Sequence, residues 1–126
     1  MNDMKRGVKL LIVEDNPLIA AAVEKAGERL HLQAEVATDG WDAIEKLRNA
    51  DYAAIVIDAD LPRHSGYGVL TYLRQENGDH LDNVILMTSS DQEAMRQHEG
   101  LAVIARTEVI DDIAAAFTIA FADDSV

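Results

Sequence analysis

The chain has 126 residues, a length that suits one domain, and we assign residues 1–126 to a single domain. It has no cysteine, which excludes disulfides and thiolate metal sites and makes a reducing cytoplasm the expected location. Its formal net charge of −12 argues against direct contact with nucleic acid or an anionic membrane and favours basic partners or cations. No apolar run reaches the roughly 18 residues that a membrane span requires, so we expect no membrane partner.

Apolar segments of strand length recur along the chain, and longer segments that fit helices separate them. The predicted strands cover residues 8–13, 33–37, 53–57, 83–88 and 102–105. Strands that are apolar on both faces and alternate with helices favour a parallel sheet covered on both sides. We therefore predict an α/β fold, a doubly wound five-stranded parallel sheet of order 2-1-3-4-5 with helices on both faces.

Helices are predicted between the strands from capping residues and from apolar residues at helical spacing. Asn16 can cap the first helix and Pro17 can occupy its first position. The weakest helical pattern lies at 90–99. The inward faces of the other helices are predicted to contain Ile19, Val23, Ala26 and Leu30; Trp41, Ile44 and Leu47; Val69, Leu70 and Leu73; and Ile110, Ile113, Phe117 and Phe121.

Polar side chains stand where the predicted strands end. In open parallel sheets, binding sites form at the carboxyl ends of the strands, near the point where the winding direction reverses. Strand order 2-1-3-4-5 makes the first and third strands neighbours, so their acids should converge. The residues at this edge are Glu14 and Asp15 after the first strand, Asp58 and Asp60 after the third, Thr88 and Ser89 at the fourth, and Arg106 after the fifth.

Converging carboxylates need a positive charge among them. Two like charges 4 Å apart repel by about 1 kcal/mol in bulk water and by several kcal/mol at a protein surface. Mg²⁺ is commonly held by one or two carboxylates together with a phosphate oxygen, so the sequence favours a Mg²⁺ site at this edge. The alternative is that Glu14, Asp15 and Asp58 are only turn and cap residues.

Three motifs in chain order resemble those of the response-regulator receiver domain of two-component signalling. They are LLIVEDNP at 10–17, IVIDADLPRHSG at 55–66 and ILMTSS at 85–90. The resemblance covers essentially the whole chain. It implies a flavodoxin-like arrangement of the predicted sheet and a phosphoprotein that takes part in a phosphorelay.

The resemblance assigns roles to the residues at the sheet edge. Asp58 resembles the phosphoacceptor, Asp15 a direct Mg²⁺ ligand, and Glu14 an acid that reaches the metal through water. Asp60 stands where the family uses a backbone carbonyl as a metal ligand, and Thr88 stands at the switch hydroxyl. The chain is then no enzyme beyond self-catalysed phosphotransfer and dephosphorylation.

The resemblance also implies partners. The donor would be a phosphohistidine on a sensor histidine kinase or a histidine phosphotransfer protein, and a downstream protein target would read the switched surface. That surface would lie near the fourth and fifth strands and the helices beside them. The last helix, 110–121, is unusually apolar on its outer side, so it is either part of a docking or homodimer face or an alanine-rich solvated helix.

The chain departs from the family pattern near the fifth strand. Arg106 stands at the usual lysine position, where it would contact the phosphoryl group, and Val103 replaces a rotating aromatic residue. The interval from Thr88 to Arg106 is also shorter than usual. These departures motivate an alternative: a degenerate receiver that acts as a phosphorylation-independent interaction module.

Two residues in the 55–66 motif carry further predictions. The Asp60 side chain either tunes the lifetime of the acyl phosphate or is a solvated turn acid. Gly66 is predicted to be a loop glycine with a positive φ before the third helix.

Two other classes of protein remain as alternatives. VIDADLP resembles the DxD strand end of haloacid-dehalogenase-type phosphatases, but that family places the motif near its start and needs further lysine and acid motifs. A flavodoxin-like cofactor binder would place hydroxyls and backbone amides after the first strand to receive a phosphate. Glu14 and Asp15 have the wrong charge for that purpose without a metal.

Overall fold

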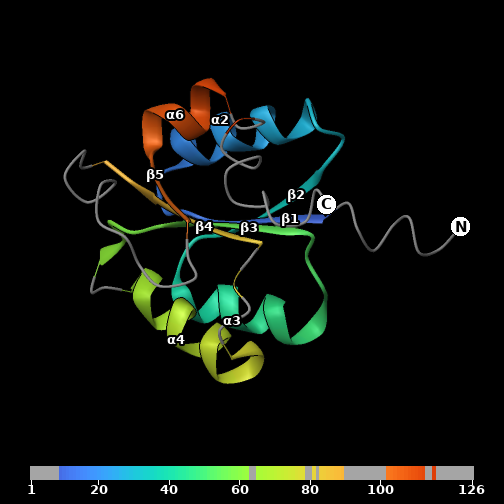
Figure 1. Cartoon of the computed structure of the whole chain (residues 1–126), viewed down its shortest axis with the longest axis vertical. Coiled ribbons are helices and arrows are strands. Elements are labelled where there is room, and N and C mark those ends of the chain that lie inside the picture. The colour runs from blue at the N-terminus through green and yellow to red at the C-terminus, as the bar shows by residue number, and fades with distance from the viewer. Residues whose placement is uncertain are drawn as a thin grey trace, which may run out of the picture.

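The computed structural model describes residues 9–62, 65–78, 81, 83–89, 102–112 and 115. All strand pairs are parallel, and the sheet order is β2-β1-β3-β4-β5 (Figure 1). The predicted doubly wound sheet is confirmed. Its strands are β1 (Lys9–Val13), β2 (Gln33–Ala37), β3 (Ala54–Asp58), β4 (Val84–Thr88) and β5 (Ala102–Ala105).

Helices cover both faces of the sheet. Helices α2 (Pro17–Glu28) and α6 (Arg106–Asp111) lie on one face, and α3 (Gly40–Asn49) and α4 (Ser65–Asn77) lie on the other (Figure 1). Helix α6 begins directly after β5, earlier than the predicted Ile110, whereas the helix predicted at 90–99 and most of that at 110–121 lie outside the described residues. Within the described residues, no helix has the length and apolar character to cross a membrane.

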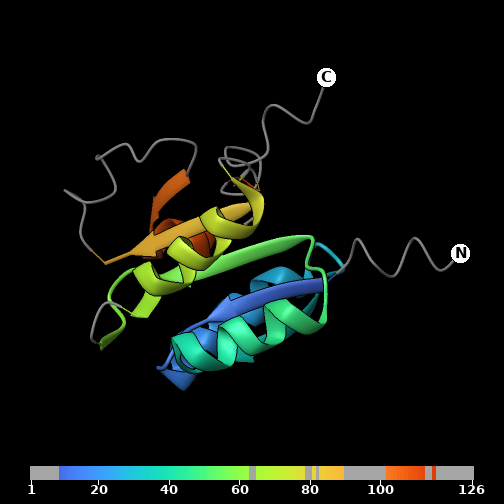
Figure 2. The ribbon, with the colours of Figure 1, turned by 90° about the horizontal axis from the view of Figure 1, so that it is seen from below.

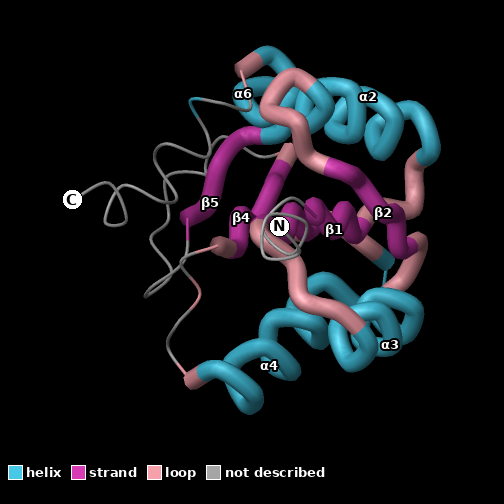
Figure 3. The backbone as a smooth tube through the Cα atoms, turned by 90° about the vertical axis from the view of Figure 1, so that its right-hand side faces the viewer, coloured by secondary structure: helices cyan, strands magenta, loops and turns pink. Residues whose placement is uncertain are grey.

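Alternate residues of the strands build two separate hydrophobic layers, because successive side chains in a strand point to opposite faces. Leu11 and Ile57 pack with the α3 and α4 side, whereas Leu10 and Val56 pack with the α2 and α6 side. The view along the strands shows the sheet between the two pairs of helices (Figure 3). The strands are apolar throughout because both of their faces are buried.

The start of α2 agrees with its sequence signals, but its end does not. The Asn16 side chain accepts the N–H of Leu18 at 2.9 Å, and Pro17 occupies the first helical position. The helix ends at Glu28, so Leu30 lies beyond it and is exposed. The prediction that Leu30 extends the buried face of this helix is wrong.

His31 explains where α2 ends. The N–H of His31 donates to the carbonyl of Glu28, the N–H of Leu32 donates to the carbonyl of Gly27, and His31 has φ 60°. This pattern is a Schellman motif, in which a left-handed residue, usually glycine, closes the helix. A histidine here carries the steric strain of a left-handed conformation.

We expect His31→Gly to raise the free energy of unfolding by about 1 kcal/mol, because glycine adopts this φ without a Cβ clash. The measurement is urea unfolding followed by circular dichroism. His31→Ala keeps the Cβ and should be no more stable than the wild type. Equal midpoints for all three proteins would show that the φ at position 31 carries no strain.

The phase of α3 differs from the prediction. Trp41 is 85% exposed, whereas Gly40 and Ala43 are buried. Helices α3 and α4 run side by side on this face (Figure 2), and a Cβ on Gly40 would lie 3.0 Å from the carbonyl oxygen of Ser65. Glycine lets the two helices approach at their N-termini, and this contact places Trp41 outward. The prediction of an inward Trp41 is wrong.

Candidate functional site

Three acids converge at the carboxyl edge of the sheet. One carboxylate oxygen from each of Glu14, Asp15 and Asp58 lies within 4.8 Å of the others. Glu14 and Asp58 are 1% and 4% exposed, whereas Asp15 is exposed. Because β1 pairs with β3 in parallel register, their ends carry these residues to one place. The predicted convergence is confirmed, and we call these three residues the acid cluster.

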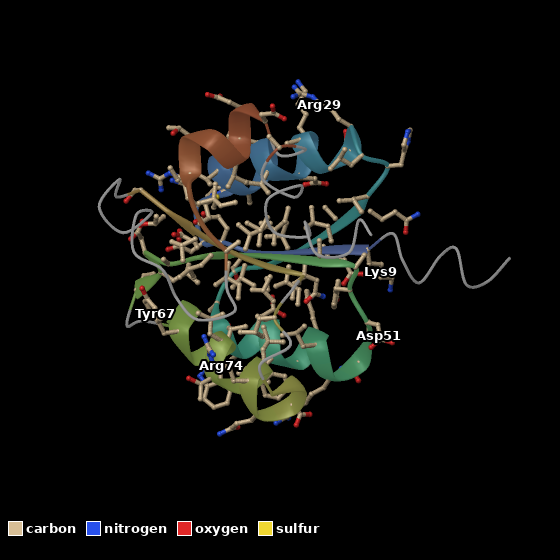
Figure 4. The ribbon with its side chains drawn as sticks, in the orientation of Figure 1. Lys9, Arg29, Asp51, Tyr67 and Arg74 are labelled. Atoms are coloured by element: carbon tan, nitrogen blue, oxygen red, sulfur yellow. The ribbon has the colours of Figure 1, made fainter. Side chains whose placement is uncertain are left out.

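The acid cluster and the start of the sheet lie at opposite edges of the molecule. Lys9, which begins β1, and Asp51, which precedes β3, lie at one edge (Figure 4). Tyr67, in the first turn of α4, lies at the other. The acid cluster belongs to this second edge, because β1 and β3 end there.

Glu14 is held in the acid cluster with one oxygen unpaired. Its Oε2 accepts the N–H of Asn16 at 3.1 Å, while its Oε1 is buried without a hydrogen-bond partner. Burial, followed by the adjacent Asp58 carboxyl group, raises the pKa of Glu14 to about 8. Buried polar atoms without partners are rare in folded proteins, so this oxygen fits a site completed by a cation.

Asp58 is fixed by its own loop and by α4. It is the last residue of β3, and its Oδ1 accepts the N–H of Asp60 at 2.8 Å. A Cβ on Gly66 would lie only 2.5 Å from the Asp58 carbonyl oxygen. Gly66 lies inside α4 and does not have a positive φ, so the prediction of a loop glycine is wrong. Its role is to let α4 contact the backbone of the phosphoacceptor candidate.

The Asp60 side chain is exposed but is not simply solvated. Its Oδ2 accepts the backbone N–H of Ser89 at 2.9 Å and the Ser89 hydroxyl at 2.7 Å. The description of Asp60 as a solvated turn acid is therefore incomplete. The sequence contained one signal for this contact: Asp60 and Ser89 follow strands that are neighbours in the predicted order.

The remaining predicted residues stand at the ends of the next two strands. Thr88 is 1% exposed, and it pairs with Ala105 in the β4–β5 register. Arg106 follows Ala105, begins α6 and is half-buried. Val103 is half-buried and packs against the core layer on the α3 and α4 side. The roles of Thr88 and Arg106 toward a phosphoryl group stay predictions.

A cavity of about 320 Å³ lies away from the acid cluster, and residues near the amino edge of the sheet, including Tyr52, Tyr72 and Asn83, line it. The Tyr52 hydroxyl donates to Oε1 of Glu35 at 2.7 Å, and burial raises the pKa of Tyr52. The Asn83 side-chain amide donates to the carbonyl of Tyr52 at 3.1 Å. These contacts tie the loop before β3 to its neighbours.

Comparison with known proteins identifies relatives of the chain. Transcriptional regulatory protein TcrA of Mycobacterium tuberculosis (strain ATCC 25618 / H37Rv) is 33% identical over 70 residues, which cover 56% of this chain but 28% of TcrA. Protein PilG of Pseudomonas aeruginosa is 24% identical over 91 residues, which cover 72% of this chain and 67% of PilG. The chain therefore corresponds to only part of TcrA.

Solved structures show the same fold. The receiver domain of the Francisella response regulator 1452 superposes with a TM-score of 0.73 at 23% identity, covering 94% of this chain and 99% of that one. The response regulator TrrA of Thermotoga maritima, in complex with Mg(2+)-BeF, gives a TM-score of 0.66 at 20% identity, covering 78% and 84%. The family model of the response regulator receiver domain matches residues 10–114, most of the chain. The chain therefore belongs to the response regulator receiver domain family.

Proposed function

We propose that this receiver domain accepts a phosphoryl group on Asp58 from a phosphohistidine of a sensor histidine kinase or a histidine phosphotransfer protein. The observation that carries the proposal is the acid cluster, in which three carboxylates lie within 4.8 Å of one another at the edge of the sheet. Asp58 ends β3 and is held by the N–H of Asp60, so its position is fixed before a donor arrives.

The acid cluster fits Mg²⁺. Glu14, Asp15 and Asp58 offer hard carboxylate oxygens, and the buried Oε1 of Glu14 has no other partner. The backbone carbonyl of Asp60 would complete the protein ligands. When bound, Mg²⁺ supplies positive charge against the carboxylates and the phosphoryl oxygens.

The protein's own residues then have defined tasks. A carboxylate oxygen of Asp58 attacks phosphorus in line, the P–N bond to the donor histidine breaks, and the imidazole leaves with the electron pair of that bond. An acyl phosphate forms on Asp58. Arg106 contacts one phosphoryl oxygen. Its planar guanidinium group spreads the positive charge, whereas the ammonium group of a lysine is compact. The Thr88 hydroxyl donates to another phosphoryl oxygen.

The movement of Thr88 would carry the signal. Thr88 is buried where β4 pairs with β5, so a shift of its side chain requires neighbouring groups to repack. A downstream protein target would recognise the changed surface near β4, β5 and α6. We propose that the protein acts in the cytoplasm. The homodimer face predicted on residues 110–121 lies mostly outside the described residues.

The interaction module that needs no phosphorylation is the second candidate. The half-buried Val103 on β5 favours it, because a small aliphatic side chain cannot rotate between two positions as an aromatic ring can. In that case the protein would bind its target equally well with and without a phosphoryl group.

The test is incubation with Mg²⁺ and acetyl phosphate, followed by intact mass spectrometry. The wild type should gain the mass of one phosphoryl group, and Asp58→Asn should gain none. Asp51→Asn, which removes an exposed acid at the opposite edge, serves as the matched control and should be labelled like the wild type. Labelling of Asp58→Asn would move the acceptor to another residue, and an unlabelled wild type would favour the interaction module.

A further inference from the structure

Asp60 and Ser89 form a clamp across the ends of β3 and β4. Oδ2 of Asp60 accepts the backbone N–H of Ser89 at 2.9 Å and its hydroxyl at 2.7 Å. The N–H of Asp60 donates to Oδ1 of Asp58 at 2.8 Å. The proposed phosphoacceptor is thus connected, through one residue, to the residue that follows Thr88.

We propose that the Asp60 carboxylate competes with the phosphoryl group for Ser89. In the unphosphorylated protein it occupies the hydrogen-bond donors of Ser89, and the phosphorylated state forms only as Ser89 leaves Asp60. This inference rests on the proposed function of Asp58 and Thr88. Asp60 is a positioning residue, because it acts through Ser89 and not on the reacting atoms.

The first reason is the placement of the donors. A phosphoryl group brings three acceptor oxygens and a charge of about −1.5 to −2, so it needs donors around it. Both donors of Ser89, its N–H and its hydroxyl, are directed at a single oxygen of Asp60. The backbone N–H becomes available to another anion at this edge only when the clamp opens, and the hydroxyl helps to keep the clamp closed.

The second reason is the covalent link between Ser89 and Thr88. Consecutive Cα atoms are about 3.8 Å apart, so a backbone movement that brings Thr88 toward Asp58 also displaces Ser89. Thr88 is buried and Ser89 is exposed at the end of β4. The clamp therefore restrains the segment whose movement would carry the signal.

The third reason is charge. A phosphoryl group on Asp58 adds negative charge beside a loop that already contains the Asp60 carboxylate, and like charges at this range repel. The hydrogen bonds of the clamp involve an ionised acceptor and belong to the stronger class. Because they are present before phosphorylation and lost after it, they lower the affinity of the site for a phosphoryl group.

The test is the dissociation constant of beryllofluoride, which stands in for the phosphoryl group, measured by amide NMR titration at saturating Mg²⁺. Ser89→Ala removes one clamp bond without changing the charge, and it should bind about threefold to tenfold more tightly. Asp60→Asn should bind about tenfold or more tightly than the wild type. In the Ser89→Ala background the gain from Asp60→Asn should be smaller, because part of the clamp is already absent.

Asp51→Asn is the control for the loss of one negative charge, and its affinity should stay within about twofold of the wild type. Unchanged affinity in Ser89→Ala, or an equal gain from Asp60→Asn in both backgrounds, would overturn the clamp and leave only a charge effect. Weaker binding by Asp60→Asn would also overturn it. A clamp that only supports the fold would lower the free energy of unfolding of both variants and leave their affinities unchanged.

These outcomes separate the clamp from the proposed function. If the clamp fails alone, the wild type still binds beryllofluoride and Asp58→Asn does not. If neither the wild type nor any clamp variant binds, the proposed function fails and the inference falls with it. If the clamp variants bind beryllofluoride and the wild type does not, the clamp would be strong enough to prevent binding, which also supports the inference.

Discussion

Gly66→Ala is expected to lower the free energy of unfolding by about 2 kcal/mol or more and to slow labelling of Asp58 by acetyl phosphate. The added Cβ would lie 2.5 Å from the carbonyl oxygen of Asp58 and 3.2 Å from Cγ2 of Ile57. The first contact is with backbone, which cannot rotate away, so α4 or the end of β3 must move. A displaced Asp58 no longer meets the other members of the acid cluster in the same geometry.

Gly68→Ala is the matched control for this substitution. Gly68 lies two residues further along α4, and a Cβ there meets nothing within 4 Å. Alanine is the better helix former, so this variant should gain about 0.5–1 kcal/mol and keep the wild-type rate of labelling. Urea unfolding and intact mass spectrometry give both quantities. Similar changes in the two variants would show that α4 does not press on Asp58.

The second large effect concerns Glu14 and pH in metal-free protein. The pKa of Glu14 is raised from 4.5 to about 8 by burial and by Asp58, so the folded state keeps a proton that the unfolded state loses above pH 4.5. The contribution of this bound proton to the free energy of unfolding is fully present below pH 4.5. It is lost as the pH rises through about 8. We expect Glu14→Gln, which stays neutral, to be on the order of 3 kcal/mol more stable than the wild type at pH 8 in EDTA.

Magnesium should reduce this advantage. Added Mg²⁺ should stabilise the wild type at pH 8 by favouring the ionised form of Glu14, and it should stabilise Glu14→Gln less, with an affinity about tenfold weaker. Thermal unfolding from pH 5 to pH 9, with EDTA or Mg²⁺, measures both effects. Glu45→Gln, at an exposed position of α3, should follow the wild-type profile. Parallel pH profiles for the wild type and Glu14→Gln would contradict a buried, proton-binding Glu14.

The sheet and the acid cluster could be predicted because both depend on the strands. Runs such as residues 55–57 are short and apolar on both faces, and this pattern favours a strand inside a covered parallel sheet. Once the order of the strands is given, the residues after β1 and β3 must meet at one edge. Glu14, Asp15 and Asp58 are therefore placed by topology, without knowledge of any loop.

What could not be predicted depends on contacts between segments. Trp41, Ile44 and Leu47 have helical spacing, but the true inward face includes Gly40 and Ala43, whose small side chains give little hydrophobic signal. The position of Gly40 against Ser65 decides the phase of α3. Likewise, the clamp between Asp60 and Ser89 depends on loop conformations that no local pattern encodes.

The exposed position of Trp41 makes it a natural optical reporter. It is the only tryptophan in the chain, so the intrinsic fluorescence of the protein comes mainly from one indole ring in the first turn of α3. Gly40 lies against Ser65, and Gly66, which follows Ser65, lies against the Asp58 carbonyl. Trp41 is therefore connected to the acid cluster through only a few residues. A protein that covers this edge would shift the emission to shorter wavelength, which allows docking to be followed without an attached dye.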